Sequence, residues 1–318
     1  MSSQPFRKIL ACIESPADRE QPVLRRAAGI AQRTGARLIL FHGDFAQLTV
    51  VPGFPSAVVR EDADSRLARS TRLLEKLAQP LRRRGLKVEV RAVWDAPPHE
   101  AIVRETLRSR PDLVVAGSRR RAFGARLFLT NTDWQLIREC PVPLLFVKQD
   151  TPWRSVRVVA AIDPLHPRGG SSKLDRRILE TAGAFSAALG GRLDVVHAYM
   201  PLSAAIPHAY GDAYAMVVDP VTELRYRKGT ERALAKATAA IGLPAARLHI
   251  ETGMPSEAIP AAARRLRADV VVMGAISRSA LGRLLIGSTA ERTLDLMPCD
   301  VLIVKPRGFK THVARRAG

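Results

Sequence analysis

The chain has 318 residues, of which 47% are apolar and only 5% are aromatic. That length suits two domains of ordinary size, each able to bury a core built mostly from Ala, Leu, Val and Ile. No apolar run reaches 18 residues and the first residues contain no secretory apolar segment, so we expect a cytoplasmic protein without a membrane span.

Short β-branched runs alternate with longer amphipathic segments, which is typical of a parallel α/β sheet. In the first half, the predicted strands are Lys8–Ile13, Leu38–His42, Lys87–Val93, Leu113–Ala116 and Pro143–Val147, and the predicted helices are Gln21–Thr34, Ala63–Arg84, His99–Ser109 and Thr132–Glu139. In the second half, the predicted strands are Val156–Ile162, Leu193–Ala198, Arg247–Glu251, Val270–Met273 and Val301–Val304, and the predicted helices are Lys173–Leu189, Val221–Ile241, Ser256–Leu266 and Thr289–Leu296. Glycines such as Gly35 and Gly190 follow predicted helices, as residues at a helix C-terminus commonly do.

The two halves match each other without a gap at an offset of 157 residues, from position 98 to position 255. Residues 98–102 read Pro-His-Glu-Ala-Ile and residues 255–259 read Pro-Ser-Glu-Ala-Ile, and residues 112–117 match residues 269–274 in the same way. A repeat of this length indicates two copies of one domain. Differences between the copies at equivalent positions therefore indicate which copy retains a working site.

The repeat sets the domain boundaries. Residues 1–149 are predicted as the first domain, 155–306 as the second, and 307–318 as a basic tail that frays. The short linker between the domains, with its proline, favours two domains packed as an intramolecular pseudo-dimer, and further homodimerisation is left open. The two fifth strands are the expected interface elements.

The chain is strongly basic, with 50 Lys and Arg against 30 Asp and Glu and a formal net charge of +20. The basic residues are spread over many segments, and the tight groups at 82–84 and 119–121 are not interleaved with aromatic rings. A platform for stacking single-stranded bases is therefore not indicated, whereas weak, salt-dependent affinity for nucleic acid follows from charge alone.

Familiar catalytic and metal-binding motifs are missing from the sequence. The three cysteines, Cys12, Cys140 and Cys299, show no CxxC spacing, and the seven histidines show no HExxH spacing. Neither a nucleophile elbow nor a Walker A motif occurs. We therefore predict no required cofactor, no metal ligands and no catalytic residues.

In the second copy, the stretch from the fourth strand to the fourth helix runs from Gly274 through Ser277 to Gly287, Ser288 and Thr289. This arrangement resembles the universal stress protein family, whose nucleotide-binding members carry G-x2-G-x9-G-(S/T) at that place. Two of the three glycines and the hydroxyl residue are present, and Ser277 stands where the second glycine would be.

Two further features carry the resemblance. Asp163 ends the first strand of the second copy, as an acidic residue does in the family. The run from Thr130 to Trp153 resembles a branch of the family whose members carry two such domains in one chain. The resemblance implies two tandem doubly wound parallel-sheet domains, Rossmann-like and of the adenine nucleotide alpha hydrolase-like type.

The resemblance also implies a stress-response protein that binds an adenine nucleotide, ATP or AMP with Mg, without catalytic turnover. Ligands of doubly wound sheets bind where the strand order reverses, which in this family lies between strands one and four. The nucleotide-binding residues are then expected in the second copy: Ala161, Ile162, Asp163, Ala198, Met273, Gly274, Ser277, Gly287, Ser288 and Thr289.

The chemistry of these residues fits a nucleotide. The Asp163 carboxylate can accept from an adenine amino group or ribose hydroxyls, and Gly274 allows close approach of the backbone. The helix start at Gly287–Thr289 suits a phosphate, with Arg278 and Arg283 adding charge. The same residues also have ordinary explanations, because Ser and Thr are common helix N-caps and glycine serves tight turns.

The first copy fits a phosphate poorly. Gly117 is retained, but Arg120 replaces Ser277 and Thr130-Asn131 replaces Gly287-Ser288. Glu14 stands at the acidic position. A site in the first copy is therefore not expected.

Two alternatives remain open for the function. The apolar segment Tyr199–Asp219, with His208, Tyr210 and Met216, would suit an apolar or lipid-like metabolite. The charge would suit a scaffold with weak polyanion affinity. A weak ATPase is a third, less favoured reading, because no catalytic base or carboxylate cluster is visible near the loop.

Overall fold

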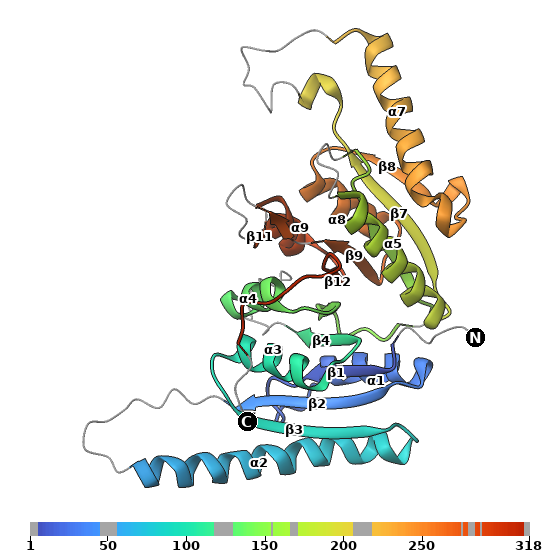
Figure 1. Cartoon of the computed structure of the whole chain (residues 1–318). Coiled ribbons are helices and arrows are strands. Elements are labelled where there is room, and N and C mark those ends of the chain that lie inside the picture. The colour runs from blue at the N-terminus through green and yellow to red at the C-terminus, as the bar shows by residue number, and fades with distance from the viewer. Residues whose placement is uncertain are drawn as a thin grey trace. The chain divides into compact units, whose positions relative to one another are not determined.

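The computed structural model describes most of the chain: residues 6–44, 56–117, 130–153, 155–165, 171–205, 218–274, 276–278, 284–286 and 288–314. At 56–62, 171–172, 276–278, 284–286 and 288 the description covers the backbone only. The chain forms two compact units (Figure 1). Unit 1 is Met1–Pro152 with Phe309–Gly318, and unit 2 is Trp153–Gly308.

Unit 1 alternates strands and helices. Its elements are β1 (Lys8–Cys12), α1 (Pro22–Thr34), β2 (Arg37–Asp44), α2 (Ser56–Arg83), β3 (Val88–Trp94), α3 (Pro98–Ser109), β4 (Leu113–Gly117), α4 (Asn131–Glu139) and β5 (Leu144–Val147).

Unit 2 repeats this order with additions. Its elements are β6 (Arg157–Ala161), α5 (Ser171–Ala188), β7 (Arg192–Tyr199), α7 (Pro220–Thr238), two 3-10 turns (Ala239–Ile241 and Ala245–Arg247), β8 (Leu248–Thr252), α8 (Pro255–Arg265), β9 (Val270–Gly274), β10 (Ile276–Arg278), β11 (Leu284–Ile286), α9 (Ser288–Leu296) and β12 (Asp300–Val304).

Both units are doubly wound parallel sheets. The strand order is β3-β2-β1-β4-β5 in unit 1 and β12-β9-β6-β7-β8 in unit 2, and neighbouring strands within each unit pair in parallel. Right-handed crossovers then place the first two helices of each unit on one face and the last two on the other. In agreement, α3 packs on α4 and α8 packs on α9. The predicted fold class is confirmed.

The central strands form the core because both of their faces are covered by helices. All four residues of β5 and all five of β12 are buried, as are the first four of β4 and of β9. Leu, Val and Ile dominate these runs, which is why uninterrupted apolar stretches predicted them well. The predicted helix stops are also confirmed, since Gly35 and Gly190 adopt left-handed φ angles of 66° and 61°.

Two differences from the predicted elements concern helix α2 and the loop after β9. Helix α2 begins at Ser56, seven residues before the predicted start at Ala63. The first turns were missed because the pair Val58-Val59 has a low helix propensity. The loop contains the antiparallel pair β10–β11, in which Ser277 pairs with Leu285. Strands of three residues are too short for periodicity to reveal.

The linker is held to unit 1. Arg26 Nη2 donates to the carbonyl oxygens of Gln149 at 3.0 Å and Thr151 at 3.1 Å, and Arg25 pairs with Asp150. Trp153 then begins unit 2, where its ring meets Phe185 edge-on at 5.9 Å between centroids. The chain therefore passes between the units within a few ordered residues.

The tail was expected to fray, and that expectation is wrong for residues 309–314. Thr311 donates its hydroxyl to Glu139 Oε2 at 2.7 Å, and the His312 amide donates to the same oxygen at 2.9 Å. Glu139 ends α4, where the helix dipole disfavours a negative charge, so donors are needed there. The tail provides them.

Within the described chain, no helix combines the length and apolar character needed to cross a bilayer.

Candidate functional site

The strand order of unit 2 reverses between β6 and β9, the place predicted for a ligand. β6 pairs with β7 on one side and with β9 on the other. Ala161 and Met273, at the carboxyl ends of β6 and β9, are 7% and 5% exposed and so form the floor of this edge. Ile162, 6% exposed, follows β6 and leads to Asp163.

Asp163 is positioned by its main chain. The Asp163 amide donates to Asp175 Oδ1 on α5 at 3.3 Å. The preceding carbonyl, that of Ile162, lies 3.1 Å from His197 Nδ1. Because a carbonyl only accepts, the neutral ring carries its hydrogen on Nδ1. The Asp163 side chain is 55% exposed.

The buried His197 side chain also lies 3.9 Å from the Asp163 carboxylate, measured from Nδ1 to Oδ1. That separation is too long for a hydrogen bond, so the contact is electrostatic when the ring is protonated. His42 holds the equivalent place in unit 1, with Nδ1 2.8 Å from the Ile13 carbonyl. The prediction that the two histidines are structural counterparts is confirmed.

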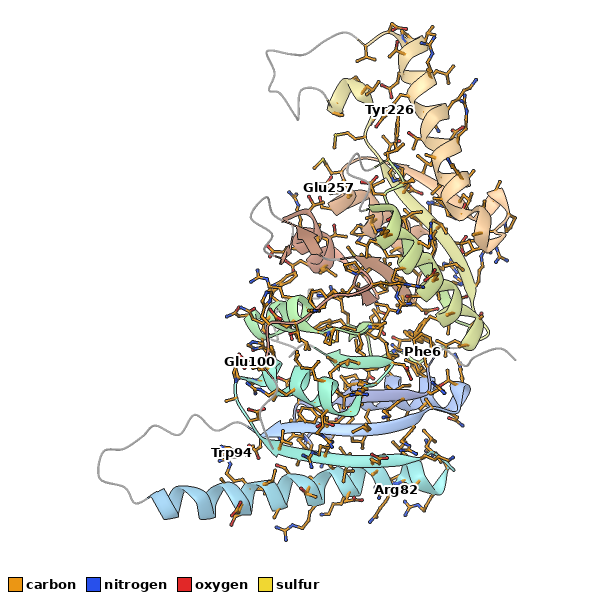
Figure 2. The ribbon with its side chains drawn as sticks, viewed as in Figure 1. Phe6, Arg82, Trp94, Glu100, Tyr226 and Glu257 are labelled. Carbon is orange, nitrogen blue, oxygen red and sulfur yellow. The ribbon has the colours of Figure 1, made fainter. Side chains whose placement is uncertain are left out.

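An aromatic corner stands beside Asp163 at the end of β7. The rings of Tyr199 and Tyr226 lie 5.5 Å apart between centroids, and Tyr226 projects from α7 (Figure 2). Tyr199 donates its hydroxyl to Glu223, whose other oxygen accepts from the Leu202 amide at 2.9 Å. Glu223 thus ties the start of α7 to the end of β7.

Burial raises the pKa of the Tyr226 phenol, and the carboxylates of Asp163 and Glu223 raise it further. Burial and the hydrogen bond to Glu223 likewise raise the pKa of Tyr199. Both hydroxyls stay protonated over the ordinary pH range and can act as donors. Neither Tyr226 nor Glu223 was predicted as a site residue; their spacing of three residues along one helix is the only sequence signal that pairs them.

Gly274 has a packing role that needs no ligand. A Cβ at this position would lie 2.7 Å from Leu174 Cδ2 on α5. Gly117 is under the same constraint in unit 1, where a Cβ would lie 2.8 Å from Val23 Cγ2. Both glycines therefore keep the fourth strand close to the first helix, and neither distinguishes a binding copy from a non-binding one.

The start of the fourth helix differs between the units. In unit 1, Thr130 Oγ1 accepts from the Asp133 amide at 3.3 Å, and Asp133 Oδ2 accepts from the Thr130 amide at 2.7 Å. This capping box satisfies the first turn of α4 internally. The offset of 157 residues puts Gly287 and Ala290 at these positions in unit 2. Their side chains have no group that can form the box.

The corner beside the site also differs between the units. In unit 1, Asp44 accepts from Ser70 at 2.9 Å and pairs with Arg66 at 3.5 Å, and Arg66 lies over the Trp94 ring at 5.8 Å. The strand register makes Asp44 and Trp94 the counterparts of Tyr199 and Thr252. In unit 1, the ion pair between Arg66 and Asp44 therefore occupies the place that Tyr199 and its neighbours take in unit 2.

The structure places the other predicted site residues as follows. Ala198 is part of β7 and half-buried, and Thr289 is exposed in the first turn of α9. Ser277 and Ser288 are placed by backbone only, in β10 and at the start of α9. Gly287 lies outside the described residues, as do Arg283, His208, Tyr210 and Met216.

No group of three or more His, Cys, Asp or Glu side chains is arranged to hold a metal ion in the part of the chain that the structure describes.

The fold and the repeated sheet edge define a tandem protein of two doubly wound α/β domains. The model of the universal stress protein family matches both halves, at residues 5–148 and 156–305. The chain therefore belongs to the universal stress protein family and is of its tandem, two-domain type.

Individual relatives agree. Universal stress protein E of Escherichia coli (strain K12) is 28% identical over 326 aligned positions, covering 97% of this chain and 96% of the relative. The crystal structure of a universal stress protein from Pseudomonas aeruginosa UCBPP-PA14 superposes with a TM-score of 0.72 at 27% identity, covering 95% of this chain and 94% of the other. A universal stress protein from Archaeoglobus fulgidus, 20% identical with a TM-score of 0.64 over 94% of this chain and 98% of the other, shares the fold. The resemblance to the tandem branch is confirmed.

Proposed function

We propose that unit 2 binds an adenine nucleotide at the carboxyl edge of β6 and β9 and that the protein acts in the stress response as a ligand sensor without turnover. The observation that carries this proposal is the exposed Asp163 carboxylate at the point where the strand order reverses. His197 and Asp175 both hold the peptide group between Ile162 and Asp163, directly before this carboxylate. A carboxylate held in this way suits the ribose hydroxyls or the adenine amino group.

The difference between the helix starts supports a phosphate in unit 2 only. Free N–H groups at a helix N-terminus attract anions, and in unit 1 the capping box already uses the amides of Thr130 and Asp133. The carboxylate of Asp133 also brings negative charge to the start of α4, which disfavours an anion there. In unit 2 the counterparts, Gly287 and Ala290, bring neither the acceptor nor the negative charge.

The ligand class follows from these two ends of the site. An anionic tail on α9 and a polar ring system beside Asp163 describe ATP or AMP, with Mg²⁺ bound to the phosphates in the case of ATP. Tyr226 adds a phenol donor and a ring face next to Asp163. In this proposal Ser288 and Thr289 donate their hydroxyls to a phosphate, and Ser277 is tolerated as a strand residue.

The experiment is a calorimetric titration of the intact chain with ATP and MgCl₂ at physiological salt, beside Asp163→Ala and the matched unit 1 variant Glu14→Ala. We expect saturable binding that Asp163→Ala abolishes and Glu14→Ala leaves unchanged. Equal binding in all three proteins would refute the site. Conversion of ATP to ADP in the same samples, lost in Asp163→Ala, would refute binding without turnover.

A further inference from the structure

The outer face of α2 presents a line of cations. Arg69, Arg72, Lys76 and Arg83 follow one another at intervals of three, four and seven residues, and all four side chains are exposed. At 3.6 residues per turn, these intervals keep the four on one side of the helix. The opposite side of α2 packs on the sheet through Ser70, Leu74, Ala78 and Leu81. We call the four cations the basic face of α2.

Nothing in the described chain neutralises this face. None of the four residues makes an ion pair with a described acidic side chain. Glu75 lies on the flank of the helix and is engaged by Arg82, which Figure 2 marks near the C-terminal end of α2. Arg66 is engaged by Asp44 and Trp94. Between Arg69 and Arg83, the one acidic residue, Glu75, therefore lies on the flank of the helix, and the four cations of the basic face point to solvent.

The same feature occurs in the equivalent helix of unit 2. The buried residues Thr230, Leu234 and Thr238 of α7 follow Ser70, Leu74 and Ala78 at a constant difference of 160 positions. That difference makes Arg232 and Lys236 the counterparts of Arg72 and Lys76, and both are exposed. Arg225 lies on the same side of α7, seven residues before Arg232. Both copies of the domain therefore present an exposed Arg and Lys, four residues apart, away from the sheet.

We propose that the basic face of α2 binds the phosphate backbone of duplex nucleic acid, independently of the nucleotide site of unit 2. Unpaired cations on a rigid helix meet phosphates without first breaking ion pairs, and neutralising phosphates releases condensed counterions. From Arg69 to Arg83 the face is about 21 Å long, the length of about six base pairs. Arg72 lies about 5–6 Å from Arg69 and from Lys76, which allows contact with successive phosphates, and Arg83 follows two turns later, about 10 Å along the helix.

The surroundings of this face favour a duplex over other polyanions. No aromatic residue occurs between Arg69 and Arg83, so single-stranded bases have no ring to stack on. Among the described residues, the exposed large apolar side chains are Val221 and Leu224, both on α7. The basic face of α2 therefore has nothing to insert into a lipid bilayer, which in-plane membrane helices require.

The test is fluorescence anisotropy of a labelled DNA duplex of about 20 base pairs, titrated with the intact chain at several KCl concentrations. The variant replaces Arg69, Arg72 and Lys76 by Gln. A matched control replaces Arg19, in the loop before α1, Arg176, on α5, and Arg264, on α8, by Gln; these are exposed cations without a described ion pair. Both variants lose three charges, and circular dichroism checks that both are folded.

We expect the variant of the basic face to bind more weakly at every salt concentration and to lower the slope of log K against log [KCl] by about 2.7, at about 0.9 per lost phosphate contact. The control should keep most of the slope of the original protein. An equal loss in both variants would overturn the proposal, because net charge would then explain the binding. The proposal would also be overturned if the protein did not bind the duplex, whether or not it bound vesicles of anionic lipid.

Discussion

His197 donates from Nδ1 to the carbonyl oxygen of Ile162 across 3.1 Å, directly before the exposed carboxylate of Asp163. His42 makes the same contact with Ile13 in unit 1. One structural bond therefore occurs in both copies, but only in unit 2 does it border the candidate nucleotide site. Comparing variants of His197 and His42 can therefore separate an effect on stability from an effect on ligand binding.

We expect His197→Ala and His42→Ala to cost similar stability, about 1–3 kcal/mol, because each leaves a carbonyl without its donor. Only His197→Ala should also weaken ATP binding, since it releases the main chain that positions Asp163. Thermal unfolding and calorimetric titration of both variants check this. If His42→Ala weakened ATP binding as much, the positioning role of His197 would be wrong.

Glu223 is expected to hold the start of α7 in place. Glu223→Ala removes the acceptor for the Tyr199 hydroxyl and the Leu202 amide, at a cost of about 1–3 kcal/mol. Hydrogen exchange should accelerate at 202–205 and in the first turns of α7. Glu231→Ala is the control, because that residue makes only an exposed pair with Arg227, which contributes about 0–1 kcal/mol. Similar exchange in both variants would contradict the account.

The tail contact should depend on pH through Glu139. Burial alone would raise the pKa of this carboxyl, but hydrogen bonds from Thr311 and His312 outweigh burial and lower the pKa. A carboxyl with a lowered folded-state pKa stabilises the fold fully above its ordinary pKa and loses that contribution as the pH falls through the folded value. The contact should therefore persist at pH 7 and be lost on acidification.

The measurement is an NMR titration of the His312 amide signal, which reports its bond to Glu139 Oε2. The signal should move towards its free position as the pH falls below the ordinary carboxyl range. In Glu139→Gln that step should disappear. An unchanged titration in this variant would show that another group controls the tail.

Much of the fold could be predicted from the sequence because the strands are buried on both faces. Val270–Gly274 and Val301–Val304 are uninterrupted apolar runs, each preceded by an aspartate, and this pattern can be recognised without tertiary information. The β10–β11 pair was missed for the opposite reason. Each strand has three residues, and their pairing depends on a turn rather than on local periodicity.

The candidate site was predictable only in part. Asp163 and the reversal of strand order between strands one and four were predicted from the resemblance to the family. Tyr226 and Glu223 reach the site because α7 returns over the end of β7, a contact that no local pattern encodes. The predicted role of Gly274, close approach of the backbone to a ligand, was also incomplete. The structure shows that a side chain at this position would meet Leu174, on the first helix of the unit.

The measurement that tests the central claim most directly is the stoichiometry of ATP binding after the capping box of unit 1 is transferred to unit 2. The variant combines Gly287→Thr with Ala290→Asp, and the control combines Thr130→Gly with Asp133→Ala; thermal unfolding checks both. We predict one ATP per chain in the original protein and in the control, and none in the transferred variant. Full binding in the transferred variant, or two ATP per chain in the original protein, would contradict a phosphate site specific to unit 2.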